Sequence, residues 1–178
     1  AYYVILGKWY VLFIIFTICT TYGSTIWIDK LVKKQNAVVK SHKEDWDRQT
    51  RKEYKEKGRK KRVAVMLFAL LCNFGILAFL KYIPYAGELG LLLPLGISFY
   101  TFQSMGYVMD VYREIVEPEK NFLKVALFVS FFPQIIQGPI AIYDKLAGQL
   151  YEGHSLRLEN LQKGALLVLW GVMKKLVI

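Results

Sequence analysis

The sequence predicts an all-α fold: a fragment of a polytopic bundle of transmembrane helices that includes a broken or re-entrant helix and an interfacial helix. Two observations carry this prediction. The 178 residues are 54% hydrophobic, and the runs 9–28 and 63–80 contain no charge. Of the 24 Lys and Arg residues, 14 lie within 29–62, so the rest of the chain is more apolar than a water-soluble domain. This composition excludes a disordered chain, a collagen-like chain and a disulfide-stapled mini-protein.

Two transmembrane helices are predicted at 9–28 and 63–80. At about 1.5 Å per residue, each run crosses most or all of a hydrocarbon core about 30 Å thick. Charged residues flank both runs: Lys8, Asp29, Lys30, Arg62 and Lys81. Aromatic side chains stand at the ends of the first run, as is typical of a membrane interface: Trp9, Tyr10 and Trp27.

The basic segment 29–62 is predicted to be a mainly helical cytoplasmic loop. Its net charge is +8, of the +10 for the whole chain. Acid-before-base pairs four residues apart favour a solvated helix: Glu44/Arg48, Asp47/Arg51, Glu53/Lys57 and Glu56/Lys60. The Lys and Arg excess favours the cytoplasmic side. Because topology accounts for this charge, we expect membrane lipid as a partner and no nucleic acid.

A third uncharged run predicts a helix at 94–112, beginning near Pro94 because proline is tolerated in a first helical turn. Its polar side chains share one helical face, and Arg113 follows them: Tyr100, Gln103, Tyr107 and Asp110. Since an amide or carboxylate facing lipid is costly, this face should meet protein or a wet cavity. Either it borders a functional site, or Asp110 and Arg113 pair and fix the helix depth. Val108 lies off this face and is expected to tolerate alanine.

The segment 122–139 is predicted to be a broken span. Pro133 and Pro139 each remove an N–H group and clash with a carbonyl four residues earlier. Gln134 and Gln137 lie between these breaks. Irregular backbone inside a membrane is tolerated where protein buries it or where it lines a cavity. The segment therefore forms either the wall of a pocket or tunnel, or a kinked helix end that emerges at the interface.

The remaining segments predict an amphipathic interfacial helix at about 140–150 and a last helix at 157–178. Cys19 and Cys72 lie within apolar runs and are expected to be buried thiols. The chain begins and ends inside apolar runs and has no signal-peptide pattern, so we expect it to be a piece of a longer polypeptide.

Motifs of common catalytic and nucleotide-binding sites are absent from the sequence, and no metal-ligand spacing is found. Its two histidines, His42 and His154, lie in polar segments, and the sequence around neither has an arrangement of Cys, His or acidic residues that indicates a metal site or a catalytic triad. No cofactor and no metal are expected. From the residues alone, the sequence predicts a polytopic membrane protein with a polar interior face, and no particular reaction.

Three segments in series resemble the membrane-bound O-acyltransferase family, within the branch that acetylates bacterial polysaccharides such as alginate. They read PLGISFYTFQSMGYVMDVYR from Pro94, ALFVSFFPQIIQGPIAIY from Ala126, and GVMKKLVI at the end of the chain. One position departs from the pattern: Glu114 stands where relatives commonly have glycine after the arginine.

This resemblance implies a membrane-embedded enzyme that moves an acyl group, here acetyl, from a cytoplasmic donor to a hydroxyl of an extracytoplasmic polysaccharide. The donor would be acetyl-coenzyme A or an acyl carrier, and the acceptor a polysaccharide or an extracytoplasmic acyltransferase partner protein. A multi-pass protein of the bacterial plasma (inner) membrane is implied. Residues expected to border the substrate tunnel are Tyr100, Gln103, Tyr107, Asp110, Arg113, Gln134 and Gln137.

No residue of this chain inherits the catalytic role, because the family's catalytic histidine follows the segment that matches GVMKKLVI. The chain alone is therefore expected to be inactive. A secondary transporter is the alternative, because its substrate site is also built on broken helices near the middle of the membrane. A histidine beside a later apolar span would favour the enzyme, whereas a second half with a related hydropathy pattern would favour the transporter.

Overall fold

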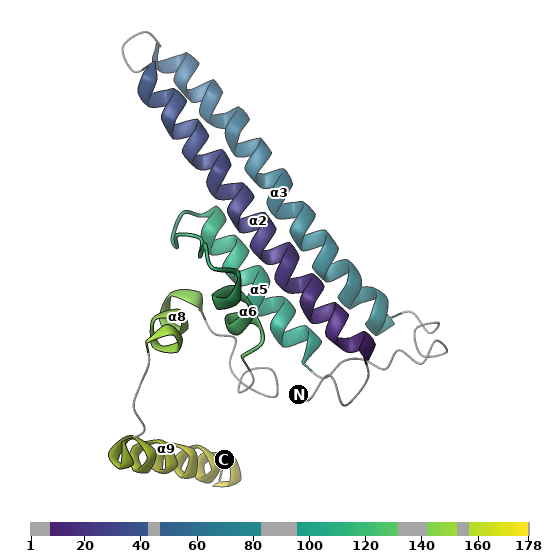
Figure 1. Cartoon of the computed structure of the whole chain (residues 1–178), viewed down its shortest axis with the longest axis vertical. Helices are drawn as coiled ribbons and strands as arrows, with labels where there is room; N and C mark the ends of the chain where they lie inside the picture. Colours follow the sequence, from purple (N-terminus) through teal and green to yellow (C-terminus); the bar gives the residue numbers. More distant parts are fainter. Residues whose placement is uncertain (1–7, 43–46, 83–95, 132–141, 153–156, 178) are drawn as a thin grey trace. The chain divides into compact units, whose positions relative to one another are not determined.

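The computed structural model describes residues 8–42, 47–82, 96–131, 142–152 and 157–177, and these ranges contain helices and no strand. The helices are α2 (Lys8–Ser41), α3 (Arg48–Tyr82), α5 (Ile97–Tyr112), α6 (Phe122–Val129), α8 (Tyr143–Tyr151) and α9 (Leu158–Val177) (Figure 1). The all-α prediction is confirmed for this part of the chain. Two compact units are formed, Ala1–Ala147 and Gly148–Ile178.

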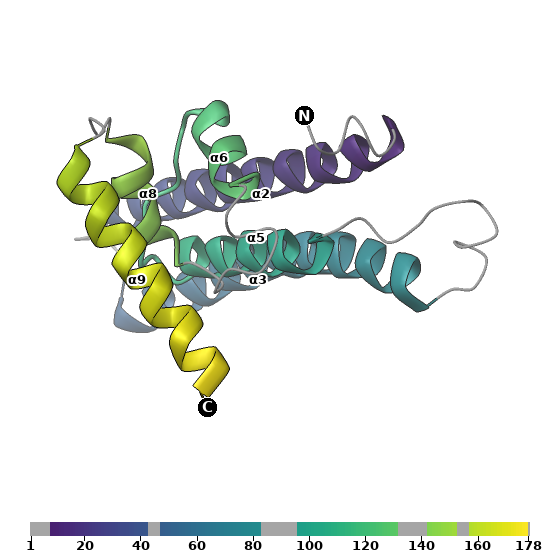
Figure 2. The ribbon, with the colours of Figure 1, turned by 90° about the horizontal axis from the view of Figure 1, so that it is seen from below.

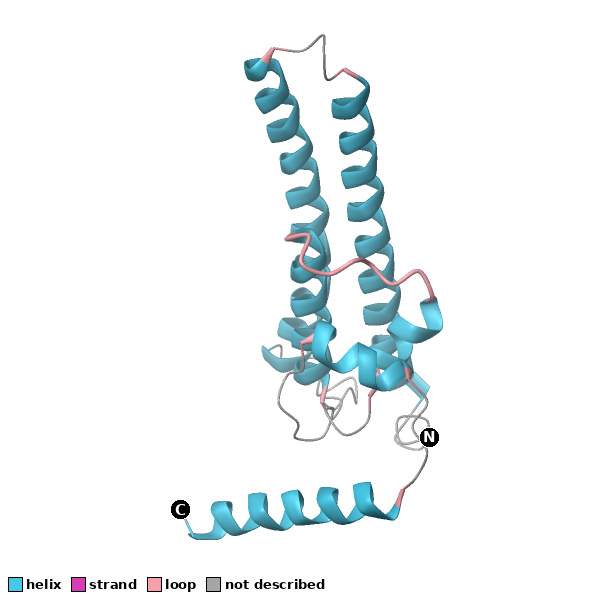
Figure 3. Ribbon diagram, turned by 90° about the vertical axis from the view of Figure 1, so that its left-hand side faces the viewer, coloured by secondary structure: helices cyan, strands magenta, loops and turns pink. Residues whose placement is uncertain are grey.

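Helices α2 and α3 lie side by side as a long antiparallel hairpin (Figures 1 and 3). Near one end, Gln35 Nε2 donates a hydrogen bond of 3.1 Å to the carbonyl oxygen of Lys55. Further along, Asn73 Nδ2 donates to Thr20 Oγ1 over 3.0 Å. Gly58 allows the close approach at the first contact, because a Cβ there would lie 2.5 Å from Gln35 Oε1.

Both long helices include an apolar window long enough to cross a membrane, within Val11–Ser41 and Arg48–Tyr82. At 34 and 35 residues, each helix is about 50 Å long, well beyond a hydrocarbon core of about 30 Å. The excess length is basic. Within 29–62, residues 29–41 and 48–62 are helical, in line with the mainly helical prediction, but they continue α2 and α3 instead of forming a separate loop. Neither proline nor a cluster of glycines interrupts these residues, so the helices extend through them.

Helix α5 packs against both α2 and α3 (Figure 2). It begins at Ile97, after Gly96, whose φ of 79° is readily adopted by glycine. Its burial extends well beyond the predicted polar face, because two long helices cover it. Val108 is 0% exposed, so the structure now favours a destabilising effect of alanine at this position, in place of the tolerance expected from the sequence.

The two cysteines differ from expectation. Cys19 is exposed on α2 and Cys72 is half-buried on α3, so the prediction of two buried thiols is wrong. The buried face of α2 instead presents small polar side chains, which let neighbouring backbones approach closely: Thr17, Thr21, Ser24 and Thr25.

The later helices are short or separate. Helix α6 ends at Val129, four residues before Pro133, whose ring would clash with the Val129 carbonyl in a continued helix. The predicted break between Pro133 and Pro139 lies outside the described residues, so its two interpretations stay predictions. Helix α8 occupies the predicted amphipathic segment, and its Tyr143 and Ala147 are buried. Helix α9 corresponds to the last predicted helix and buries none of its described residues.

Candidate functional site

The predicted polar face of α5 is buried within the first unit. Tyr100 and Tyr107 are 1% exposed and Gln103 is 2% exposed. Asp110 is half-buried one turn later, and Arg113 is exposed beyond the end of the helix. The expectation that Tyr100, Gln103 and Tyr107 meet protein is confirmed, because the elements around α5 cover them. The face thus changes from fully buried to accessible along the helix.

Gln103 joins α5 to the end of α6. Its Nε2 atom donates a hydrogen bond of 3.0 Å to the carbonyl oxygen of Phe128. Phe128 lies in the last turn of α6, where carbonyl groups lack intrahelical partners. The same carbonyl also accepts a longer bond of 3.4 Å from the N–H group of Phe131, so Gln103 supplies the shorter of its two hydrogen bonds. Gln103 therefore stabilises a helix end that the sequence interrupts a few residues later.

Tyr107 holds three segments together through its ring and its hydroxyl. Its ring stacks on Tyr143 at a centroid distance of 4.2 Å and meets the ring of Phe128 edge-on at 5.9 Å. Phe128 and Tyr143 are also in edge contact, at 4.9 Å. These three rings form an aromatic cluster that joins α5, α6 and the start of α8. Gln103 and Tyr107 thus fix α6 from two successive turns of α5.

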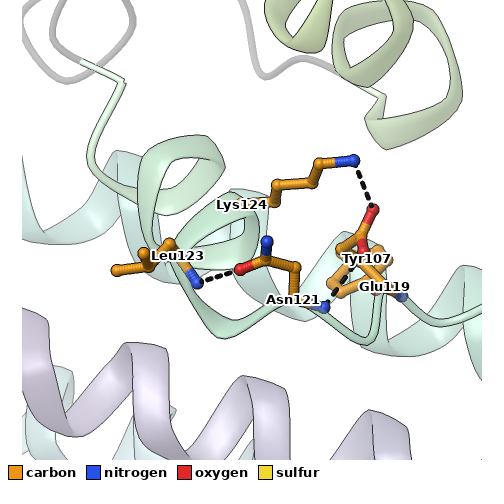
Figure 4. A network of polar contacts seen from close by, with 5 residues as sticks. All are labelled: Tyr107, Glu119, Asn121, Leu123 and Lys124. Carbon is orange, nitrogen blue, oxygen red and sulfur yellow. Dashed lines mark hydrogen bonds and ion pairs between the residues drawn. The ribbon is translucent and has the colours of Figure 1, made fainter.

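A small polar network continues from Tyr107 to the start of α6 (Figure 4). The Tyr107 hydroxyl accepts a hydrogen bond of 2.8 Å from the Glu119 N–H group. Glu119 Oε1 in turn accepts from the Asn121 N–H group at 3.0 Å, and its Oε2 lies 3.7 Å from Lys124 Nζ. Asn121 caps α6, because its Oδ1 accepts from the Leu123 N–H group at 2.9 Å. Sequence reasoning missed Glu119 and Asn121, although an asparagine directly before an apolar run is a recognisable helix start.

The end of α5 departs from the predicted pairing. Among the described residues, Asp110 and Arg113 form no ion pair with each other. Instead Arg62 of α3 pairs with Glu114. Glu114 has a φ of 60°, and the N–H groups of Glu114 and Ile115 donate to the carbonyls of Val111 and Asp110. This is the Schellman ending, which favours glycine at the left-handed position. The left-handed backbone at this position thus explains why the resembling family commonly has glycine there.

A polar hollow of about 320 Å³ lies between α2 and the segment that follows α5. It includes Asp29 and Lys33, which form an ion pair along α2, and Glu114 and Glu117 from the segment 114–117. Val111 is the residue of α5 in its lining, so the hollow lies at the end of that helix. The described residues contain no cluster of three or more His, Cys, Asp or Glu that could hold a metal ion.

Two of the predicted tunnel residues, Gln134 and Gln137, and the histidine His154 lie outside the described residues. The structure therefore assembles Tyr100, Gln103 and Tyr107 and places Asp110 and Arg113 at the end of their helix. Glutamine and tyrosine side chains can orient a substrate by hydrogen bonding, but neither is a base near neutral pH. Within the described residues, this face can position groups and shield them from lipid.

Comparison with known proteins indicates a reaction, which the geometry alone does not. The chain is 39% identical to the probable alginate O-acetylase AlgI of Pseudomonas syringae pv. tomato over 87 residues, which are 49% of this chain and 17% of that protein. It is 33% identical to the AlgI of Pseudomonas putida, over 63% of this chain and 21% of that protein. It is 30% identical to the peptidoglycan O-acetyltransferase of Helicobacter pylori, over 64% of this chain and 29% of that protein.

The chain spans less than a third of the length of these relatives. No family model matches it, and no solved structure matches it. The resemblance to O-acetyltransferases predicted from the three segments is confirmed by these relatives. With the two long apolar helices, it indicates a membrane-associated chain.

Proposed function

We propose that this chain is part of a membrane-embedded O-acyltransferase, which moves an acetyl group from a cytoplasmic donor to a hydroxyl of an extracytoplasmic polysaccharide. The observation that carries the proposal is the similarity to O-acetyltransferases whose names include two different polymers, alginate and peptidoglycan. Acetyl transfer is what these relatives have in common, so the proposal commits to the reaction and leaves the polymer open.

The polar face of α5 supports this proposal as part of a substrate tunnel. An acyl donor and a sugar hydroxyl need a polar route through the membrane, and polar side chains there face protein or water. The proposed wall consists of Tyr100, Gln103, Tyr107, Asp110, Arg113, Gln134 and Gln137. The last two lie outside the residues that the structure describes. Gln103 and Tyr107 fix α6, which leads toward Pro133, and so they act as positioning residues for the wall.

The transfer itself needs groups beyond those on this face. The acceptor hydroxyl oxygen attacks the carbonyl carbon of a thioester, either acetyl-coenzyme A or an acyl carrier. The new C–O bond forms first and gives a tetrahedral intermediate, whose collapse breaks the C–S bond. A base takes the hydroxyl proton and then gives it to the departing sulfur. Oxyanion donors stabilise the tetrahedral intermediate. We propose that the base lies in another part of the whole protein. This chain covers less than a third of the length of its relatives, so most of such a protein lies outside it.

The proposed protein is multi-pass in the bacterial plasma membrane. Its spans are placed at about 9–28, 63–80, 94–112, 122–139 and 157–178, and the basic segment 29–62 is placed in the cytoplasm. Labelling of a single cysteine introduced at Gln49, which is exposed at the start of α3, tests this topology. We expect an impermeant thiol reagent to label it only after the cells are opened. Labelling of intact cells would overturn the cytoplasmic placement.

The activity can be tested in cells that lack the gene and receive the full-length protein or an empty vector. We expect acetyl esters on an envelope polysaccharide to appear with the protein and to be absent with the empty vector. Gln103→Leu should lower the ester content more than Met109→Leu, a change at a more exposed position of α5. Unchanged ester content together with altered uptake of a labelled solute would favour the secondary transporter and overturn the proposal.

A further inference from the structure

The outer face of the α2–α3 hairpin carries an apolar groove that the acyl-transfer proposal does not use. The groove has a volume of about 430 Å³ and lies between the two long helices. Its lining is Trp27 and Leu31 from α2, and Lys61, Ala64, Val65 and Phe68 from α3. The α3 residues follow a spacing of three, four and seven from Lys61, so they share one helical face. Ala64 has the smallest side chain of this face. The space above it forms the groove, and the larger side chains of Trp27 and Phe68 help to enclose it.

The groove ends where the apolar part of the hairpin meets its basic part. Lys61 is the second-last residue before the uncharged run that begins at Val63. Trp27 is 59% exposed at the rim, and tryptophan concentrates at the depth of lipid headgroups. Further outward on the same faces, Lys34 of α2 and Lys57 of α3 are both exposed. The apolar groove thus runs inward from Lys61, and Lys34 and Lys57 follow about one turn further outward on the two helices.

The acidic side chains near the groove pair with other basic residues, so the Lys61 ammonium group can bind an anion. The neighbouring Arg62 points to the other side of α3, where it pairs with Glu114. Asp29 pairs with Lys33, which lines the polar hollow on the opposite side of α2. Among the described residues, no acid forms an ion pair with Lys61. A purely apolar helix packed here would bury the Lys61 ammonium group without a counter-charge, which is unfavourable.

We propose that this groove binds an anionic phospholipid, with one acyl chain along Ala64, Val65 and Phe68 and the phosphate beside Lys61. The apolar walls match an acyl chain, and Lys34, Lys57 and Lys61 match a negatively charged headgroup. The lysine stem can follow the apolar wall while its ammonium group stays at headgroup depth. This lipid is a ligand held at one place on the hairpin, separate from the acyl donor and the acceptor polymer.

Photolabelling of the full-length protein in lipid nanodiscs tests the proposal. The probe is phosphatidylglycerol with a diazirine in one acyl chain, and the control probe is phosphatidylcholine with the same chain. We expect phosphatidylglycerol to label residues around Val65 and Phe68 more strongly than phosphatidylcholine does. Lys61→Gln should lower that labelling about fivefold. Ala64→Phe, which fills the groove, should abolish it.

Matched variants separate the groove from general effects on charge and folding. Lys52→Gln removes a lysine from the outer part of α3, and Ala78→Phe adds the same bulk at an exposed position far along that helix. Both should label like the wild type. Equal labelling by the two lipids would show that the headgroup is not selected, and would overturn the proposal. Absence of labelling at the groove with either lipid would also overturn it, because another protein surface would then cover these residues.

Discussion

Gln103 of α5 donates a hydrogen bond of 3.0 Å to the main-chain carbonyl of Phe128, 25 residues later in the last turn of α6. The amide is 2% exposed, so this is a buried polar contact between two helices. A stripe of polar side chains in an apolar run usually indicates a functional site in a membrane. Here part of the stripe has a structural task as well: Gln103 and Tyr107 hold the helix that precedes the predicted break. In the proposed tunnel, the same two residues would also fix the position of the wall.

Replacing Gln103 by leucine should destabilise the protein by about 0.5–1.5 kcal/mol, because the Phe128 carbonyl loses the shorter of its two hydrogen bonds and keeps the one from Phe131. The change keeps side-chain volume and removes the amide. Thermal unfolding of the purified full-length protein measures it. Met109→Leu, at a more exposed position of the same helix, should leave the unfolding midpoint nearly unchanged. Equal midpoints for the two variants would show that the hydrogen bond contributes nothing to stability.

Glu114 offers a comparison between a backbone effect and an ion pair. Its left-handed φ of 60° costs a residue with a Cβ atom roughly 1 kcal/mol relative to glycine. Its pair with Arg62 is 54% exposed on the Glu114 side, so it stabilises by about 0–1 kcal/mol. Glu114→Gly and Glu114→Ala both lose the pair, but only alanine keeps the strain. Denaturation should therefore show the glycine variant to be the more stable of the two by roughly 1 kcal/mol; the reverse order would contradict the assigned helix ending.

Val108→Ala should cost about 1–3 kcal/mol, because the side chain is 0% exposed and its loss leaves a cavity. The matched control is Val168→Ala in α9, where the valine is 66% exposed. Thermal unfolding of the two variants in parallel gives the measurement. If Val108→Ala proved as mild as the control, α5 would not be packed between α2 and α3 as described.

Gly58→Leu should separate the outer parts of α2 and α3. A Cβ at this position would lie 2.5 Å from Gln35 Oε1, so the Gln35 side chain must leave its contact with the Lys55 carbonyl. Pulsed electron paramagnetic resonance between spin labels at Ala37 and Glu56 reports the distance, which we expect to increase. Gly75→Leu serves as the control, because a Cβ at Gly75 meets no described atom within 4 Å. An unchanged distance in Gly58→Leu would show that this glycine does not set the helix separation.

The long elements could be predicted from the sequence, because uncharged runs and acid-before-base pairs report on helices directly. Burial of Tyr100, Gln103 and Tyr107 followed from their common face. The sequence did not reveal that Val108 is also buried, because helical periodicity cannot show how many neighbours surround a helix. The exposure of Cys19 was missed for the same reason.

The partners of the polar groups were harder to predict than the groups themselves. Pairing of Asp110 with Arg113 fitted their spacing of three residues, but the helix ends between them and Arg62 reaches Glu114 from α3. The bond from Gln103 to a main-chain carbonyl has no sequence signature, because any residue offers a carbonyl. The Asn121 cap had a signature that was overlooked.

Acetyl transfer by the full-length protein in proteoliposomes tests the central claim most directly. A donor labelled in its acetyl group is supplied on the side of the basic segment, and the polysaccharide acceptor on the other. We expect label in ester linkage on the polymer with the full-length protein, and none with residues 1–178 alone, where His42 is exposed at the outer end of α2 and Asp110 is the one described carboxylate of the α5 face. No transfer by the full-length protein with either donor class would contradict the proposed function. Transfer by residues 1–178 above a protein-free control would show that the catalytic group lies within this chain.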